Sequence, residues 1–135
     1  MQHDEFVGQV QHRARLASRG DAEGAIRATL ETLADRLQPR AAAHLAAQLP
    51  PEIALHLRGV SHPQHLDLHQ FYSRVAGRED APVDVAKAAF HARAVMETLG
   101  EAVSLGALRK LVRQMPEEFR DLLPRTVTTA TNRDF

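Results

Sequence analysis

The chain has 135 residues, with 17 basic residues (Lys and Arg), 17 acidic residues and an apolar fraction of 44%. This length fits one ordinary domain, and the composition is typical of a soluble globular protein, which excludes collagen-like, mucin-like and acidic disordered chains. A net charge of zero also argues against a protein that holds nucleic acid by bulk positive charge, because such proteins normally carry a basic surplus.

Cysteine is absent from the sequence, which excludes disulfide frameworks, thiolate zinc sites, iron–sulfur clusters and cysteine nucleophiles. The N-terminal segment carries Asp4 and Glu5 where a signal peptide needs a basic start and an apolar run. No stretch approaches the roughly 18 apolar residues of a membrane span, so we expect a cytoplasmic protein that uses no membrane. Fifteen arginines against two lysines, with abundant alanine, are typical of GC-rich bacterial genes.

A helical period runs through the first half of the chain. Apolar residues spaced by four, three and four positions form one helical face, and they are Ile26, Leu30, Leu33 and Leu37. Asp21 is the expected N-cap of this helix, and Pro39 lies just beyond its end. Alanine-rich sequence then favours a short helix ending near Leu49, and a Pro-Pro break precedes a further helix over 52–57.

The second half repeats this pattern. The equivalent apolar stripe consists of Ala92, Met96, Leu99 and Val103. Pro82 suits the start of its helix, Ser104 is the expected cap of a helix running to about Gln114, and a last helix is predicted over 117–123. No run of β-branched residues alternates with a period of two, so we predict no strand.

The two halves resemble each other in sequence. A shift of 66 residues places the segment 30–33 (LETL) on METL, and the segment 48–53 (QLPPEI) on QMPEEF. Near the starts of the halves the shift is 65, where Phe6 meets Phe71. Two matched blocks at one interval are hard to obtain by chance in so short a chain, so we infer an internal duplication.

The predicted organisation is a first helical repeat over 1–58, a linker over 59–66, a second helical repeat over 67–124 and a mobile tail over 125–135, within one compact domain. The predicted fold class is all-α: a helical bundle built from two homologous four-helix repeats with approximate two-fold symmetry. With five Phe, one Tyr and no Trp, each half would be marginal alone, so we expect the repeats to bury their apolar stripes together.

These motifs carry a family resemblance. Asp-Glu-Phe near the start of a half, the Leu-Glu-Thr-Leu helix and the Gln-Leu-Pro-x-Glu turn resemble the bacterial family catalogued as domain of unknown function 2267, over about residues 3 to 124. The second turn departs mildly, with Met115 where the pattern prefers Leu, and the His-rich linker is not a family feature. The resemblance implies an all-helical, cytoplasmic, bacterial protein, and it supplies no activity, substrate or catalytic residue.

Histidines gather around the predicted linker, where His62, His65 and His69 lie close to Asp67. On one helix, two histidines four residues apart share a face and can chelate Zn, Ni or Cu. Asp67, however, is equally suited to cap the helix bearing Phe71, which would leave His65 outside that helix. We therefore favour a solvated linker over a metal site. A response to pH is a further alternative, because mild acidification protonates up to eight histidines and so raises the net charge of the chain.

Four glutamates recur at equivalent positions of the halves: Glu31, Glu97, Glu52 and Glu118. The first two each lie four residues after an arginine, Arg27 or Arg93, and are predicted to pair along their own helices. The other two fall in first helical turns, where a carboxylate favours the helix dipole. Thr32 and Thr98 also recur, without a base or an oxyanion site nearby in sequence. These patterns favour structural roles over catalysis.

No phosphate-binding glycine loop, HExxH motif or nucleophile elbow occurs. Arg109, Lys110 and Arg113 form a small basic helix face, which we interpret mainly as a solvated surface, with an acidic partner or a phosphate backbone as alternatives. No aromatic residue is interleaved there to stack on a base. The sequence therefore assigns no catalytic, cofactor-binding or metal-binding residue and no cofactor.

Elimination favours a non-enzymatic helical module that binds another protein, in a stress-related or regulatory setting. The alternative is a small-molecule or metal-binding protein, or an enzyme, with its site between the two repeats, and a third hypothesis is nucleic-acid binding through the second half. A polar, concave site between the halves would favour a ligand, whereas a closed apolar contact would favour a scaffold. The identity of the protein partner and the oligomeric state are left open.

Overall fold

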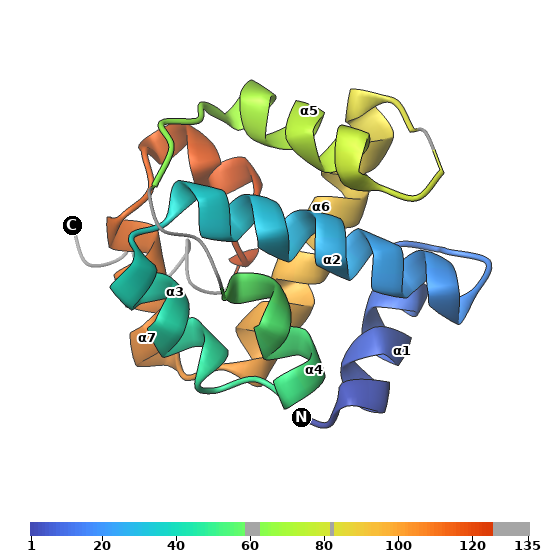
Figure 1. The fold of residues 1–135 in the computed structure, drawn as a ribbon, viewed down its shortest axis with the longest axis horizontal. Helices are drawn as coiled ribbons and strands as arrows, with labels where there is room; N and C mark the ends of the chain where they lie inside the picture. Colours follow the sequence, from blue (N-terminus) through green and yellow to red (C-terminus); the bar gives the residue numbers. More distant parts are fainter. Residues whose placement is uncertain (59–62, 82, 126–135) are drawn as a thin grey trace.

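The structure, a computed structural model, describes residues 1–58, 63–81 and 83–125. Within these ranges all regular structure is helical, as predicted, and no strand occurs (Figure 1). In chain order the elements are α1 (His3–Arg13), α2 (Arg19–Arg36), α3 (Pro39–Ala46), α4 (Pro51–Ala54), η1 (Leu55–Leu57), α5 (Leu68–Arg78), α6 (Val85–Ala102), α7 (Leu105–Arg113) and η2 (Glu117–Asp121), where η marks a 3₁₀ helix. None of the helices in the described part has the length and apolar character needed to cross a bilayer.

The two longest helices, α2 and α6, pack against each other at the centre of the molecule. Both α1 and α5 contact this central pair, and α3 packs against α7. In Figure 1, α5 lies above α2, α1 lies beneath the N-terminal end of α2, and α6 passes behind it. Helices from the two halves of the chain are therefore interleaved, and they share one hydrophobic core.

The predicted apolar stripes form the centre of this core. The stripe of α2 is buried from Ile26 to Leu37, and the stripe of α6 is buried from Ala92 to Val103. Phe71 of α5 meets Phe119 edge to face, with the ring centroids 5.8 Å apart. Burying large apolar side chains of this kind contributes about 1.5–3 kcal/mol each, so the stripes account for much of the driving force of folding.

Short polar side chains set the helix starts, and one predicted cap was wrong. The N-cap of α2 is Ser18, whose hydroxyl accepts the backbone N–H of Asp21 at 3.0 Å, so Asp21 lies in the first turn and the helix begins earlier than predicted. Asp67 caps α5 in a capping box, as predicted, and Ser104 caps α7, as predicted. The predicted Pro82 start of α6 lies outside the described residues, and Asp84 is the N-cap observed.

Proline opens helices in this chain as well as ending them. Pro39, which the sequence placed just beyond α2, is the first residue of α3, where its missing N–H costs nothing. The alanine-rich helix ends at Ala46, three residues before the predicted Leu49. The last predicted helix is only the 3₁₀ turn η2, which follows Pro116.

Part of the predicted linker packs on the core. Leu66 is buried, and its carbonyl accepts a hydrogen bond from the Arg36 guanidinium at 3.0 Å. The N–H of Gln64 donates to the carbonyl of Asp35 at 2.7 Å. These contacts fix the approach to α5. The predicted mobile tail lies outside the described residues beyond position 125.

Candidate functional site

A groove separates α3 and α7, two short helices that pack side by side although they lie in different halves of the chain. It encloses about 370 Å³. Its floor is apolar, and Ala41 and Leu45 of α3 face Ala107 and Leu111 of α7 across it. We call this feature the α3–α7 groove. Its volume is within the range that binds small ligands or a few protein side chains.

The sequences of the two helices explain why the groove is hollow and apolar. Leu45 of α3 and Leu111 of α7 are buried against the core. The other apolar side chains that line the groove are small alanines, which fill little space, and longer polar side chains such as Gln48 and Gln114 line the rest of it. One hydrogen bond ties the two helices together at the edge, because the side-chain oxygen of Gln48 accepts the backbone N–H of Ser104 at 2.7 Å.

The two helices that border the α3–α7 groove are basic, and His44 and Lys110 line the groove itself. Neither α3 (PRAAAHLA) nor α7 (LGALRKLVR) contains an acidic residue. Their basic side chains are all exposed, and they are Arg40, His44, Arg109, Lys110 and Arg113. None of these five makes a hydrogen bond or an ion pair within the described part of the chain. The basic residues predicted on α7 are therefore exposed, as expected, and α3 adds two more exposed basic residues.

Many of the basic side chains elsewhere in the fold form ion pairs. Seven arginines form ion pairs with carboxylates, and they are Arg13, Arg19, Arg27, Arg74, Arg78, Arg93 and Arg120. The basic side chains of α3 and α7 are thus among those with no ion pair in the described part of the chain, although the net charge of the whole chain is zero. Exposed cations of this kind attract anionic groups and raise the rate at which an acidic partner associates.

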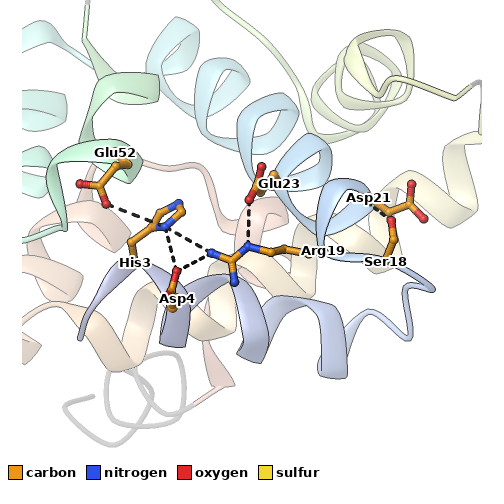
Figure 2. Close-up of polar contacts among 7 residues, drawn as sticks. All are labelled: His3, Asp4, Ser18, Arg19, Asp21, Glu23 and Glu52. Atoms are coloured by element: carbon orange, nitrogen blue, oxygen red, sulfur yellow. Dashed lines mark hydrogen bonds and ion pairs between the residues drawn. The ribbon is translucent and has the colours of Figure 1, made fainter.

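A polar cluster at the other end of α2 shows the paired arrangement (Figure 2). Arg19 lies between Asp4 of α1, at 2.5 Å, and Glu23 of α2, at 3.2 Å. The Nδ1 atom of His3 lies 3.4 Å from Asp4 and 3.8 Å from Glu52. The hydrogen bond from Arg19 holds the pKa of the Asp4 carboxyl below its usual value. Arg19 and His3 thus already lie beside carboxylates, and the cluster holds α1, α2 and α4 together.

The histidines singled out by the sequence do not form a site among the described residues. His62 lies outside the described residues, whereas His65 and His69 are exposed. The carboxylate of Asp67 is used by the capping box of α5, as the sequence suggested. No group of three or more His, Asp or Glu side chains placed to hold a metal ion is found across 1–58, 63–81 and 83–125.

Of the four recurring glutamates, only Glu31 has the predicted partner on its own helix. Glu31 pairs with Arg27 along α2 at 3.6 Å, as predicted. The equivalent pairing in α6 was wrong, because Arg93 reaches Asp121 of η2 at 2.9 Å instead of Glu97. Glu118 accepts the N–H of Leu68 at 2.8 Å, which ties η2 to the start of α5, and Glu52 lies beside His3.

Sequence reasoning missed the basic residues that α3 adds. Arg40 and His44 stand alone in an alanine-rich segment and form no local charge run. The available signal was the absence of acidic residues from 36 to 51 and again from 102 to 116. What the sequence does not show is that these two segments, about 66 residues apart, lie side by side.

Comparison with known proteins gives one match. The family model described as "Uncharacterized conserved protein (DUF2267)" matches residues 3–122, which is nearly the whole described chain. None of the curated proteins compared with the chain matches it.

Proposed function

Because this chain belongs to the family of uncharacterized conserved proteins DUF2267, whose description gives no activity, we propose its function from the α3–α7 groove: it is a non-enzymatic module that binds an acidic, amphipathic helical segment of a partner protein. One observation carries the proposal. An apolar groove is lined by His44 and Lys110, it lies between two helices that carry basic and no acidic side chains, and none of these basic side chains has an ion pair in the described part of the chain.

The shape of the groove favours a helix as the occupant. Partner helices dock by placing apolar side chains spaced by three and four residues into a groove, and its volume of about 370 Å³ holds a few such side chains. His44 and Lys110 line the groove itself, one from each helix, where they can meet carboxylates on either side of that apolar strip. Nucleic acid is less well matched, since neither α3 nor α7 carries an aromatic side chain on which a base could stack.

We also propose that the two halves are repeats related by an approximate two-fold axis. Helix lengths support this, because α1 and α5 have 11 residues each and α2 and α6 have 18 each. Across the groove, Leu45 and Leu111 differ by the same 66 positions as the sequence repeat, and so do Gln48 and Gln114. On this proposal the α3–α7 groove lies where the two copies meet.

Reciprocal contacts between the halves give further support. Arg13 at the end of α1 donates to the Thr98 hydroxyl of α6 at 3.0 Å and pairs with Glu101. Arg78 at the end of α5 makes the equivalent contacts to α2. It donates to the Thr32 hydroxyl at 3.1 Å and lies 2.8 Å from Asp35. Each half therefore places one arginine on a Thr and a carboxylate of the other half. The bacterial origin, the cytoplasmic location and a regulatory or stress-related setting stay predictions.

Peptide binding tests the proposal. The probe is a labelled Leu/Glu peptide of about 15 residues, near the length at which an isolated helix becomes stable, with leucines at helical spacing. A second peptide has Lys in place of Glu. We expect fluorescence anisotropy to show saturable binding of the acidic peptide that weakens with added salt, and much weaker binding of the basic peptide.

Matched charge reversals locate the site. The double variant Arg109→Glu/Lys110→Glu should weaken binding about tenfold or more, since each lost charge pair is replaced by a repulsion. The control is Arg15→Glu/Arg58→Glu, which makes the same change in net charge at two exposed arginines away from the groove. Equal weakening in both variants would contradict the assignment. Tighter binding of duplex DNA than of the acidic peptide would replace the proposed partner with nucleic acid.

A further inference from the structure

A second cavity, of about 390 Å³, lies between the α1–α2 turn and the junction of α5 with α6. Both halves of the chain contribute to its wall. Leu16 and Ala25 come from the first half, whereas Val83 and Phe90 come from the second. Phe90 is 41% exposed, which is unusual for so large an apolar side chain. We call this feature the α5–α6 cavity, and it shares no lining residue with the α3–α7 groove.

A buried histidine–carboxylate pair faces this cavity. The Nδ1 atom of His91 lies 2.8 Å from the Glu79 carboxylate, and the two side chains are only 8% and 7% exposed. Because an ionised carboxylate can only accept hydrogen bonds, the Nδ1–H donates to Glu79. This bond fixes the ring, and in the neutral imidazole the other nitrogen, Nε2, then carries a lone pair. Nε2 has no hydrogen-bond partner among the described residues, and His91 is part of the cavity wall.

Two cations at the α5–α6 cavity form no ion pair in the described part of the chain. Of the acidic lining residues, Glu79 is engaged by His91, and Asp80 pairs with Arg27 at 2.6 Å. Arg15 and Lys87 also line the cavity, and neither has a partner within the described part of the chain. Because a neutral His91 leaves the charge of Glu79 in place, Asp21 and Glu79 balance these two cations, but neither carboxylate forms an ion pair with them.

We infer that the α5–α6 cavity binds a small organic carboxylate that carries a hydroxyl group on an apolar body. The ligand carboxylate is held by Arg15 and Lys87, neither of which has an ion pair among the described residues. The apolar body lies against the exposed ring of Phe90 and the neighbouring aliphatic side chains. The hydroxyl donates to Nε2 of His91, whose orientation Glu79 has already fixed. This inference concerns a site and a ligand distinct from those of the proposed peptide groove, and neither depends on the other.

Nuclear magnetic resonance of the full chain tests the inference with three probes of nearly equal size. They are 3-(4-hydroxyphenyl)propionate, 3-phenylpropionate, which lacks the hydroxyl, and tyramine, in which an ammonium group replaces the carboxylate. We expect the hydroxylated carboxylate to shift the signals of Phe90 and of the His91 ring in a saturable way. We expect 3-phenylpropionate to bind several-fold more weakly, because the Nε2 lone pair then stays unpaired, and tyramine to bind weakest of the three.

Charge reversals provide the matched controls. Lys87→Glu and Arg15→Glu should each weaken binding of the hydroxylated carboxylate about fivefold or more. Lys110→Glu, which makes the same change at the α3–α7 groove, should leave this binding unchanged while weakening the acidic peptide. All three sites are exposed, so circular dichroism should show the folded protein in each variant. Any one of three results would overturn the inference. Tyramine could bind as tightly as the carboxylates, the cavity could show no saturable shifts, or Lys110→Glu could weaken binding as much as Lys87→Glu and Arg15→Glu do.

Discussion

The chain has two crossings between its halves, Arg13 against α6 and Arg78 against α2, where each arginine lies against a carboxylate. The basic side chains of α3 and α7, by contrast, have no ion pair among the described residues. Arg13 and Arg78 each reach a threonine and an acidic residue of the other half. Lys110 and its neighbours on the α3–α7 groove are exposed, and no acidic residue lies on either helix. At the crossings, arginines form ion pairs that join helices. At the groove, the basic side chains are exposed and can bind a partner. Substitutions in the two regions should therefore separate stability from binding.

The largest effect is expected at the more buried crossing. The Asp35 side chain is only 11% exposed and accepts ion pairs from both Arg74 and Arg78. Asp35→Ala leaves these two half-buried guanidinium groups without their carboxylate, and we expect it to lower the free energy of unfolding by about 2 kcal/mol. Urea denaturation monitored by circular dichroism measures this change.

The equivalent acid at the other crossing provides the matched control. Glu101 occupies the position 66 residues after Asp35, and its side chain is 44% exposed. Water screens its pair with Arg13, so Glu101→Ala should cost only about 0.5 kcal/mol. Equal costs for the two variants would show that burial does not distinguish the crossings.

His56 of η1 tests a third situation, a half-buried basic group without an ion pair in the described part of the chain. Burial lowers the pKa of the His56 imidazole, against the opposing attraction of Glu31. A histidine whose folded pKa lies below its unfolded value of about 6.5 gives stability that is present above that pH and is lost as the pH falls through the folded pKa.

His56→Gln should therefore flatten the loss of stability between pH 7.5 and pH 5, which is measured as the shift of the urea midpoint. An unchanged pH dependence in this variant would assign the acid sensitivity to other groups. The paired arginines provide the contrast, because their charge does not change over this range.

The smallest effect on stability is expected at the α3–α7 groove. Arg109→Gln/Lys110→Gln removes two exposed cations that have no partner in the described structure, and their mutual repulsion disappears with them. The free energy of unfolding should change by less than about 0.5 kcal/mol, while the acidic peptide loses affinity. A loss of stability comparable to that of Asp35→Ala would mean that the groove cations support the fold.

The sequence predicts well what depends on nearby residues. The apolar stripes from Ile26 and from Ala92 identify α2 and α6, because a period of 3.6 residues is a local property. Choosing between two suitable caps is harder. Ser18 and Asp21 are both good N-cap residues, and only the folded backbone shows that Ser18 is extended at the cap while Asp21 is already helical.

Contacts between distant segments could not be predicted in this way. Arg93 has Glu97 within reach along its helix, yet Asp121 competes for it from η2. The α3–α7 groove requires two amphipathic helices from different halves to lie side by side, and neither helix alone indicates a groove. The pairing of His91 with Glu79 likewise depends on how α6 turns back against the end of α5.

The most direct test of the account is a titration of the ¹⁵N-labelled full chain with the acidic Leu/Glu peptide, followed by amide chemical shifts. The account predicts saturable shifts that cluster on α3 and α7 together, that fade as salt is added and that vanish in Arg109→Glu/Lys110→Glu. Shifts confined to other helices, or shifts on α3 and α7 that persist in this variant, would contradict it.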